Sequence, residues 1–261
     1  MVCICGSAPD RITKFIGQPI GTRRVIDKRY LTMGKVKRRV FISATYDTYL
    51  DEQQNSVKWG IIQRVIDAGY EPHIFFPVVP DRFAATARRE MPWTTDKLLE
   101  ILRGACGAVM IGYPRWSHGD HPHASEFTHY EGGVAYTMGI PVLNVLEQGI
   151  LWRGGFDPTS AQICEVPRGA EESWLKNSYF DQFFSKWRTD LQARYDIFLG
   201  YSGKSAGTAK NLMRVLKEKD VRVLDWQEFQ PGTILEQIKK AAALCTGGVF
   251  LFTADDDLAV C

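Results

Sequence analysis

The chain has 261 residues, of which 45% are hydrophobic, 24% are charged and 12% are aromatic. This composition is that of an ordinary globular protein, and it excludes a disordered tail, a collagen-like chain and a small disulfide scaffold. The net charge of +2 hides an asymmetry, because residues 1–40 hold ten Lys or Arg against two Asp or Glu. The remaining 22 basic and 28 acidic residues make the rest of the chain acidic, so we do not expect a nucleic-acid partner.

The beginning of the chain, residues 1–35, is basic and is expected to be a flexible extension. Met33 offers an alternative start just before the first strand-like segment. The extension lacks the charged, apolar and small-residue order of a secretory signal. We expect no membrane partner, because the chain has no apolar run of the roughly 18 residues that a membrane helix needs. Six cysteines without a Cys-x-x-Cys pair indicate free thiols and predict a cytoplasmic protein.

Residues 36–165 are expected to form a first domain in which strands and helices alternate. Residues 107–112 are apolar throughout, as in a strand that is buried on both faces of a sheet. Residues 113–128 look like a long polar loop. The other expected elements are strands at 39–43, 71–77 and 140–145, and helices at 57–68, 94–103 and 130–138. This alternation predicts a parallel sheet flanked by helices.

Residues 166–194 are expected to be a linker with a helix at 183–191, after an irregular stretch at 148–180. Residues 195–261 then repeat the pattern of the first domain. The expected elements of this second domain are strands at 195–200, 221–225 and 248–253, and helices at 206–219 and 233–243. Such a unit usually has about five strands, so the second copy looks incomplete. The predicted fold class is α/β, with two consecutive units of parallel strands flanked by helices.

Ligands of open parallel sheets bind beyond the carboxyl ends of the strands. The acid at this edge of the first domain is Glu131, which we place at the N-terminus of the helix at 130–138. A helix N-terminus would hold its carboxylate ionised, and the two glycines that follow would let a substrate approach. We therefore favour a catalytic role for Glu131 over a role as a partner of the helix dipole. The binding candidates of this domain are Ser43, Tyr46, Phe75, Tyr113, Arg115, Trp116, Glu126, Tyr130 and Gly133.

Several of these residues have two interpretations. Tyr113, Trp116 and Tyr130 suit stacking on a base, although packing in the core or a loop explains Tyr113 and Trp116 equally well. Arg115 suits a phosphate, because its planar donors match phosphate oxygens. Glu126 suits ribose hydroxyls, but a cap on the following helix is the simpler interpretation.

The histidines of the same region admit a zinc site by their spacing. They lie at positions 118, 121, 123 and 129. No cysteine lies among them, and Gly119, Asp120 and Pro122 indicate a solvated loop. We therefore expect no metal.

The segment at 129–143, Glu-Gly-Gly-Val-Ala above all, resembles the catalytic segment of nucleoside 2-deoxyribosyltransferases and of TIR-type NAD-cleaving domains. The resemblance covers about residues 38–147. It implies a flavodoxin-like or TIR-like domain. It also implies that Glu131 attacks or stabilises the anomeric carbon of a ribosyl–base bond.

The second domain resembles bacterial TIR-like nucleotide-binding domains that are associated with antiphage signalling systems. The residues that carry this resemblance lie at 196–202, 223–236 and 248–256. It implies a catalytic Glu in a Phe-Glu-Leu-Gly-type segment after the third strand, and the sequence ends at Cys261 before that point. We therefore expect no catalytic acid in this domain and regard Ser202 and Trp226 as ligand-binding candidates.

The two resemblances together imply an N-glycosidic bond hydrolase that acts on NAD or a related nucleotide as an antiphage effector. NAD would be its substrate, and no cofactor is expected. We expect a nucleotide ligand and self-association of the active form. Two alternatives remain open at this point: a nucleotide sensor without catalysis, and a nucleoside 2-deoxyribosyltransferase.

Overall fold

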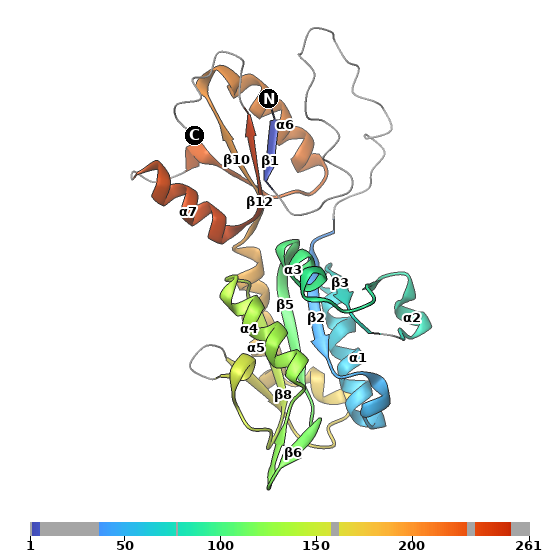
Figure 1. Cartoon of the computed structure of the whole chain (residues 1–261). Coiled ribbons are helices and arrows are strands. Elements are labelled where there is room, and N and C mark those ends of the chain that lie inside the picture. The colour runs from blue at the N-terminus through green and yellow to red at the C-terminus, as the bar shows by residue number, and fades with distance from the viewer. Residues whose placement is uncertain (1, 6–36, 77, 158–161, 229–232, 252–261) are drawn as a thin grey trace. The chain divides into compact units, whose positions relative to one another are not determined.

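The structure is a computed structural model, and it describes residues 2–5, 37–76, 78–157, 162–228 and 233–251. The chain divides into two compact units (Figure 1). The larger unit is Arg38–Ala193, and the smaller one combines residues 1–37 with residues 194–261.

The larger unit is built on a six-stranded parallel sheet with the strand order β4-β3-β2-β5-β8-β9. Its strands are β2 (Arg39–Ala44), β3 (Glu71–Ile74), β4 (Arg88–Arg89), β5 (Ala105–Gly112), β8 (Val142–Glu147) and β9 (Ile163–Val166). Its α-helices are α1 (Glu52–Asp67), α2 (Asp81–Ala84), α3 (Thr95–Arg103), α4 (Glu126–Thr137) and α5 (Ser178–Gln192). Every residue of β5 is buried, because helices cover both faces of the sheet. The predicted parallel α/β architecture is thereby confirmed.

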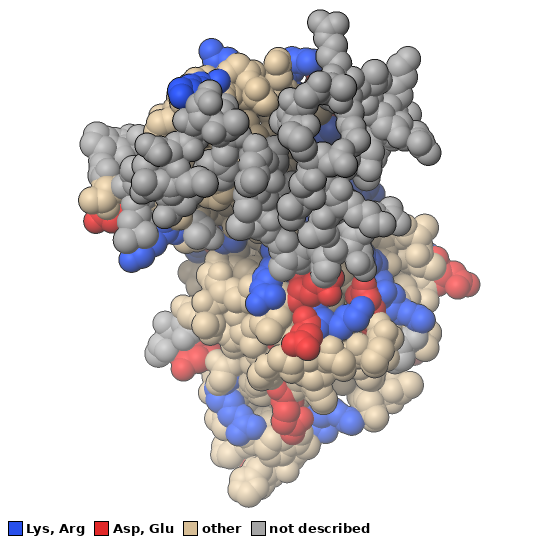
Figure 2. Space-filling view, turned by 45° about the horizontal axis from the view of Figure 1, so that its top comes forward, with Lys and Arg blue, Asp and Glu red and all other residues tan. Residues whose placement is uncertain are grey.

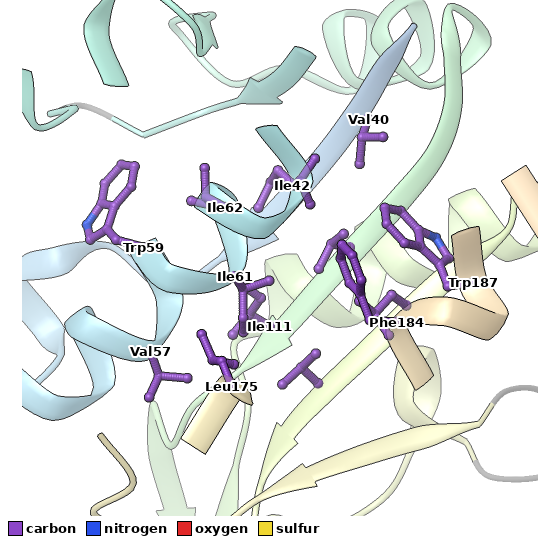
Figure 3. Packing of buried hydrophobic residues seen from close by; sticks show 14 of the residues in the cluster. Val40, Ile42, Val57, Trp59, Ile61, Ile62, Ile111, Leu175, Phe184 and Trp187 are labelled. Carbon is purple, nitrogen blue, oxygen red and sulfur yellow. The ribbon is translucent and has the colours of Figure 1, made fainter. Parts of the chain in front are cut away.

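One face of this sheet packs against α1 and α5, and the other packs against α3 and α4. Figure 3 shows part of the first core, in which labelled side chains of the sheet, of α1 and of α5 face one another. They include Val40, Ile42 and Ile111 from the sheet, Ile61 and Ile62 from α1, and Phe184 and Trp187 from α5. Each such side chain contributes about 1.5–3 kcal/mol when it is fully buried.

Helix α1 begins and ends where its sequence provides caps. Asp51 and Gln54 form a capping box, in which each side chain bonds to the other residue's backbone N–H. Gly69 follows the helix with a φ of +90°, a conformation that glycine adopts without steric cost. The helix is therefore fixed by local sequence as well as by its apolar face.

Helix α5, expected in a linker, packs on the sheet of the larger unit instead. Its Leu191 is fully buried in the first core. A Cβ atom on Gly107 of β5 would lie 2.2 Å from Leu191 Cδ2, so glycine is needed for this close approach. The strand β9 also belongs to this sheet, although residues 148–180 were expected to be irregular.

The smaller unit has a four-stranded sheet with the order β1-β12-β10-β11. Its elements are β1 (Val2–Cys5), β10 (Tyr195–Tyr201), β11 (Val223–Asp225), β12 (Cys245–Leu251), α6 (Ala206–Glu218) and α7 (Ile234–Leu244). Strands β10, β11 and β12 are parallel, whereas β1 pairs with β12 in the antiparallel direction. The expectation of a flexible extension is thus wrong for residues 2–5, because β12 offers them a free edge to pair with. The rest of residues 1–35 lies outside the described parts.

Two features between β5 and β8 differ from the sequence prediction. The expected loop at 113–128 contains a hairpin of β6 (Trp116–His118) and β7 (His121–His123). Helix α4 begins at Glu126 rather than at Tyr130, because the Ser125 side chain accepts a hydrogen bond from the backbone N–H of Phe127 and caps it.

The described surface mixes both signs of charge. On the face that Figure 2 shows, Lys and Arg side chains lie among Asp and Glu side chains. Cys106, Cys164 and Cys245 are buried and form no disulfide bond. Within the described ranges, no helix combines the length and the apolar character that crossing a membrane requires.

Candidate active site

Two of the predicted site residues, Ser43 and Glu131, contact each other directly. Ser43 lies near the carboxyl end of β2 and Glu131 lies on α4. The Ser43 hydroxyl donates a hydrogen bond to Oε2 of Glu131. The other carboxylate oxygen, Oε1, accepts a hydrogen bond of 2.6 Å from the indole Nε1 of Trp93. Both oxygens of this buried carboxylate therefore have a donor.

The environment of Glu131 raises its pKa to about 7. Burial is the largest cause, because the side chain is only 5% exposed and burial disfavours the charged form. The hydrogen bonds from Ser43 and Trp93 act in the opposite direction, since they stabilise the carboxylate. A carboxyl group with this pKa exchanges its proton near neutral pH, which suits acid–base and nucleophilic chemistry.

The structure corrects the position that we expected for Glu131. The first residue of α4 is Glu126, so Glu131 lies in the second turn of the helix. The favourable effect of a helix dipole is confined to the first turn. The carboxylate is therefore not held ionised by a helix N-terminus, and its two side-chain donors only partly offset the effect of burial on its pKa.

Trp93 was not among the predicted site residues. It lies between β4 and α3, directly before Thr94, whose side chain caps α3. Its ring packs edge-on against Phe75 (centroids 6.4 Å apart), Phe127 (5.0 Å) and Tyr130 (6.1 Å). Trp93 lies in an irregular segment that no periodic pattern marks, so no signal in the sequence indicated its contact with Glu131.

A pocket of about 340 Å³ opens beside Trp93. Its lining residues are Trp93, Thr95, Glu126, Phe127 and Tyr130. Glu126 and Tyr130 were predicted, whereas Trp93, Thr95 and Phe127 were missed. Glu131 itself is not part of the lining, and Trp93 is the residue that both lines the pocket and contacts the carboxylate.

Two further predicted residues, Tyr46 and Phe75, lie around this centre, and Gly133 lies on α4. Burial raises the pKa of Tyr46, and the negative charge of Glu131 raises it further. Phe75 is buried, and its ring packs edge-on against the ring of Trp93. At Gly133 of α4, an added Cβ would meet no atom within 4 Å, so the backbone there is open to an approaching group.

The loop after β2, which carries Tyr46, is held by a buried lysine. Lys58 of α1 is fully buried and forms an ion pair with Asp47. Its ammonium also donates to the backbone carbonyl of Thr45 at 3.3 Å, and Trp59 Nε1 donates to Asp47 at 2.9 Å. Burial lowers the pKa of Lys58, and its bond to Asp47 opposes that effect. This network fixes the loop next to Ser43.

Tyr113, Arg115 and Trp116 do not line the pocket. Tyr113 is buried in the core beside α1 and α5, and burial strongly raises the pKa of its hydroxyl. The Arg115 guanidinium lies 3.5 Å from the centroid of the Tyr49 ring. Trp116 stacks on His123 with centroids 4.2 Å apart. For Tyr113 and Trp116, the structure thus favours the packing interpretation.

The neighbouring histidines also pack rather than converge. His129 meets Phe156 edge-on with ring centroids 5.4 Å apart, and burial lowers its pKa. In the part of the chain that the structure describes, no three His, Cys, Asp or Glu side chains gather into a group that could hold a metal ion.

Ser202 and Trp226 belong to the smaller unit. Trp226 packs edge-on against Tyr201 with centroids 5.9 Å apart. The Tyr201 hydroxyl bonds to Asp225 Oδ2 at 3.1 Å, and Ser202 bonds to Ser205 at 3.4 Å. Ser202 directly follows β10 and Trp226 directly follows β11, at the carboxyl ends of the strands, where ligands of parallel sheets bind.

A comparison with protein-family models shows which family the sequence of the smaller unit resembles. The model for the TIR domain of CAP12/Pycsar effector proteins matches residues 196–260. This part of the chain is therefore TIR-like, in agreement with the resemblance seen in its sequence. No curated protein matches the chain. The likeness of the larger unit to nucleoside 2-deoxyribosyltransferases stays a hypothesis, because neither comparison matches that unit.

Proposed function

We propose that the chain hydrolyses the N-glycosidic bond of a nucleotide, that NAD is the leading substrate, and that Glu131 is the catalytic carboxylate. The observation that carries this proposal is the buried Glu131, which accepts hydrogen bonds from Ser43 and from Trp93, a residue that lines a pocket with aromatic walls. Aromatic walls suit a planar base. A carboxylate beside the sugar suits the positive charge that develops on it.

The reaction breaks the bond between C1′ and the base nitrogen, and the base leaves with the electron pair. Positive charge then builds up on C1′, and the ionised Glu131 stabilises it or bonds to it for a time. Water supplies the oxygen of the new C1′–O bond and gives up one proton, which a carboxylate of this pKa accepts near neutral pH. Ser43 and Trp93 orient the carboxylate through their hydrogen bonds.

The match of residues 196–260 to the TIR domain of CAP12/Pycsar effector proteins supports a role in antiphage defence. In this proposal the smaller unit binds a nucleotide through the region of Ser202 and Trp226, and the larger unit carries out the cleavage. We also propose that the active form self-associates and works in the cytoplasm.

One observation favours a second candidate, a nucleotide sensor without catalysis. Glu131 is nearly buried and does not line the pocket, so a substrate reaches it only after Trp93 moves aside. In this second candidate, Trp93 stays in place and the pocket binds a nucleotide. The Glu131 carboxylate then only stabilises the fold through its hydrogen bonds.

Product analysis with the full chain and NAD separates the candidates. Release of nicotinamide together with free ADP-ribose supports hydrolysis. Exchange of one base for another on the sugar supports a transferase instead. If NAD raises the melting temperature but no product forms, the sensor is correct, because ligand binding to the folded state alone accounts for the stabilisation.

A further inference from the structure

The hairpin of β6 and β7 carries two exposed histidines at its tip. His118 ends β6 and His121 begins β7, and the two residues pair directly across the hairpin. Only Gly119 and Asp120 separate them in the turn. Gly119 has a φ of +59°, a conformation that two-residue hairpin turns favour at this position. In Figure 1 the hairpin extends beyond the six-stranded sheet of the larger unit.

The register of the hairpin places both imidazoles on the same face. Residues directly opposite each other in an antiparallel pair point to one side, with Cβ atoms about 4.5–5.5 Å apart. Bonds between a metal ion and an imidazole nitrogen are about 2.0–2.1 Å long for zinc. A single ion between the two rings can therefore reach one nitrogen of His118 and one of His121.

A third imidazole on this face, that of His123, is engaged in packing. His123 pairs with Trp116, one step along the ladder from the pair at the tip. Its ring stacks on the indole, and only 3% of the residue is exposed. This agrees with the finding that, within the described ranges, no three potential ligands gather around one point. Two histidines at an exposed tip form an open site, which differs from the closed zinc centre that the histidine spacing alone suggested.

The charges near the tip do not oppose a cation. Asp120 lies in the turn between the two histidines and brings one negative charge to the tip. The guanidinium of Arg153 lies 5.2 Å from the centroid of the Trp116 ring, at the other end of the hairpin. The positive group is thus held beside the indole rather than beside the paired imidazoles.

We propose that His118 and His121 together bind one divalent transition-metal ion of the kind that imidazole favours, such as Zn²⁺, Ni²⁺ or Cu²⁺. Water fills the other coordination positions. Once one ring has bound the ion, the second binds it intramolecularly, so the pair binds more tightly than either ring alone. The site is independent of the proposed function, because neither histidine lines the pocket beside Trp93.

Metal binding would link the two strands of the hairpin across their turn. Ser125, which caps α4, lies two residues after the end of β7. The ion therefore stabilises the segment that leads into the helix with Glu131. An ion that binds only the folded hairpin should raise the melting temperature as its concentration increases.

The test is a titration of the full chain with Ni²⁺, measured by calorimetry. Ni²⁺ suits imidazole, whereas Zn²⁺ is also bound by cysteine thiolates. We expect one Ni²⁺ per chain to bind below millimolar concentrations. His118→Gln and His121→Gln should each weaken binding by about tenfold or more, because each leaves a single imidazole at the tip.

His129→Gln is the matched control. It removes an imidazole of the neighbouring helix α4, whose ring packs against Phe156, and it should bind Ni²⁺ as tightly as the parent. Absence of binding to the parent at millimolar Ni²⁺ would overturn the proposal. Equal binding by the parent and the two hairpin variants would overturn it as well.

NMR spectra of the parent locate the ion without any variant. Paramagnetic Ni²⁺ should first broaden the amide signals of residues 117–122, which surround the paired histidines. Broadening that begins in another segment would place the ion elsewhere and refute the site. Both measurements are read without NAD, so their result and the result of the cleavage assay are independent.

Discussion

The hydroxyl of Ser43 donates a hydrogen bond to the carboxylate of Glu131, although 88 positions separate the two residues in the sequence. The contact forms because Ser43 lies near the carboxyl end of a central strand and α4 packs over that strand on one face of the sheet. It ties the candidate catalytic group to a buried strand of the larger unit, so we expect its loss to be visible in the chemistry.

Ser43→Ala should raise the pKa of Glu131 above about 7, because it removes a bond that stabilises the ionised form. The ionised carboxylate is the reactive form, so activity should rise with pH and its midpoint should move to higher pH. Losing a hydrogen bond to a charged group shifts the pKa by about one unit. Below the midpoint of the profile, the variant should therefore cleave NAD about tenfold more slowly than the parent. The measurement is the pH profile of kcat/KM for NAD cleavage. Ser117→Ala, at an exposed position of β6, is the control and should keep the parent profile.

Glu131 should also make the stability of the protein fall as the pH rises. The folded state keeps the proton up to about pH 7, whereas the unfolded chain loses it near the ordinary pKa of 4.5. Between these values the folded state binds more protons, so the free energy of unfolding decreases by about 1.4 kcal/mol per pH unit, about 3 kcal/mol in all.

Glu131→Gln cannot ionise and should show a flatter dependence on pH over this window. The measurement is urea unfolding of both proteins at several pH values from 4.5 to 8. The amide itself shifts the stability by a constant amount, so the slopes are compared rather than the absolute values. Parallel curves for the parent and the variant would show that the pKa of Glu131 is not raised.

Two glycines should respond to alanine in opposite directions. Gly107→Ala brings a Cβ to 2.2 Å from the buried Leu191 side chain and should destabilise the larger unit by about 1–3 kcal/mol. Gly133→Ala meets no atom within 4 Å on α4 and should stabilise it by about 1 kcal/mol, since alanine favours a helix. Urea unfolding measures both effects. A Gly107→Ala variant as stable as the parent would contradict the packing of α5 on β5, and a destabilised Gly133→Ala variant would contradict the open space at that position of α4.

The sequence predicted most of the architecture, because the alternation of strands and helices is visible in single segments. The apolar run that became β5 and the glycine that ends α1 are examples. Grouping residues at the carboxyl ends of the strands also placed Ser43, Glu126 and Glu131 in one region.

Other features depend on contacts that no local pattern contains. Trp93 belongs to an irregular segment, so its bond to Glu131 follows only from the folded chain. The start of α4 depends on one cap hydrogen bond from the backbone N–H of Phe127 to the Ser125 side chain, and this start places Glu131 in the second turn rather than the first. The raised pKa of Glu131 comes from its burial, which also follows only from the folded chain. The pairing of β1 with β12 joins the two ends of the sequence, and no periodicity indicates such a partner.

The most direct test of the account is the rate at which Glu131→Gln cleaves NAD, compared with the parent and with Glu126→Gln. Glutamine keeps the size of the side chain and removes its charge, so the loss should fall on the chemical step while NAD binding stays nearly the same. We predict a rate reduction of about 10²–10³ or more for Glu131→Gln and a smaller one for Glu126→Gln, with melting temperatures close to that of the parent. Cleavage by a folded Glu131→Gln variant at the parent rate would contradict the assignment of Glu131 as the catalytic carboxylate.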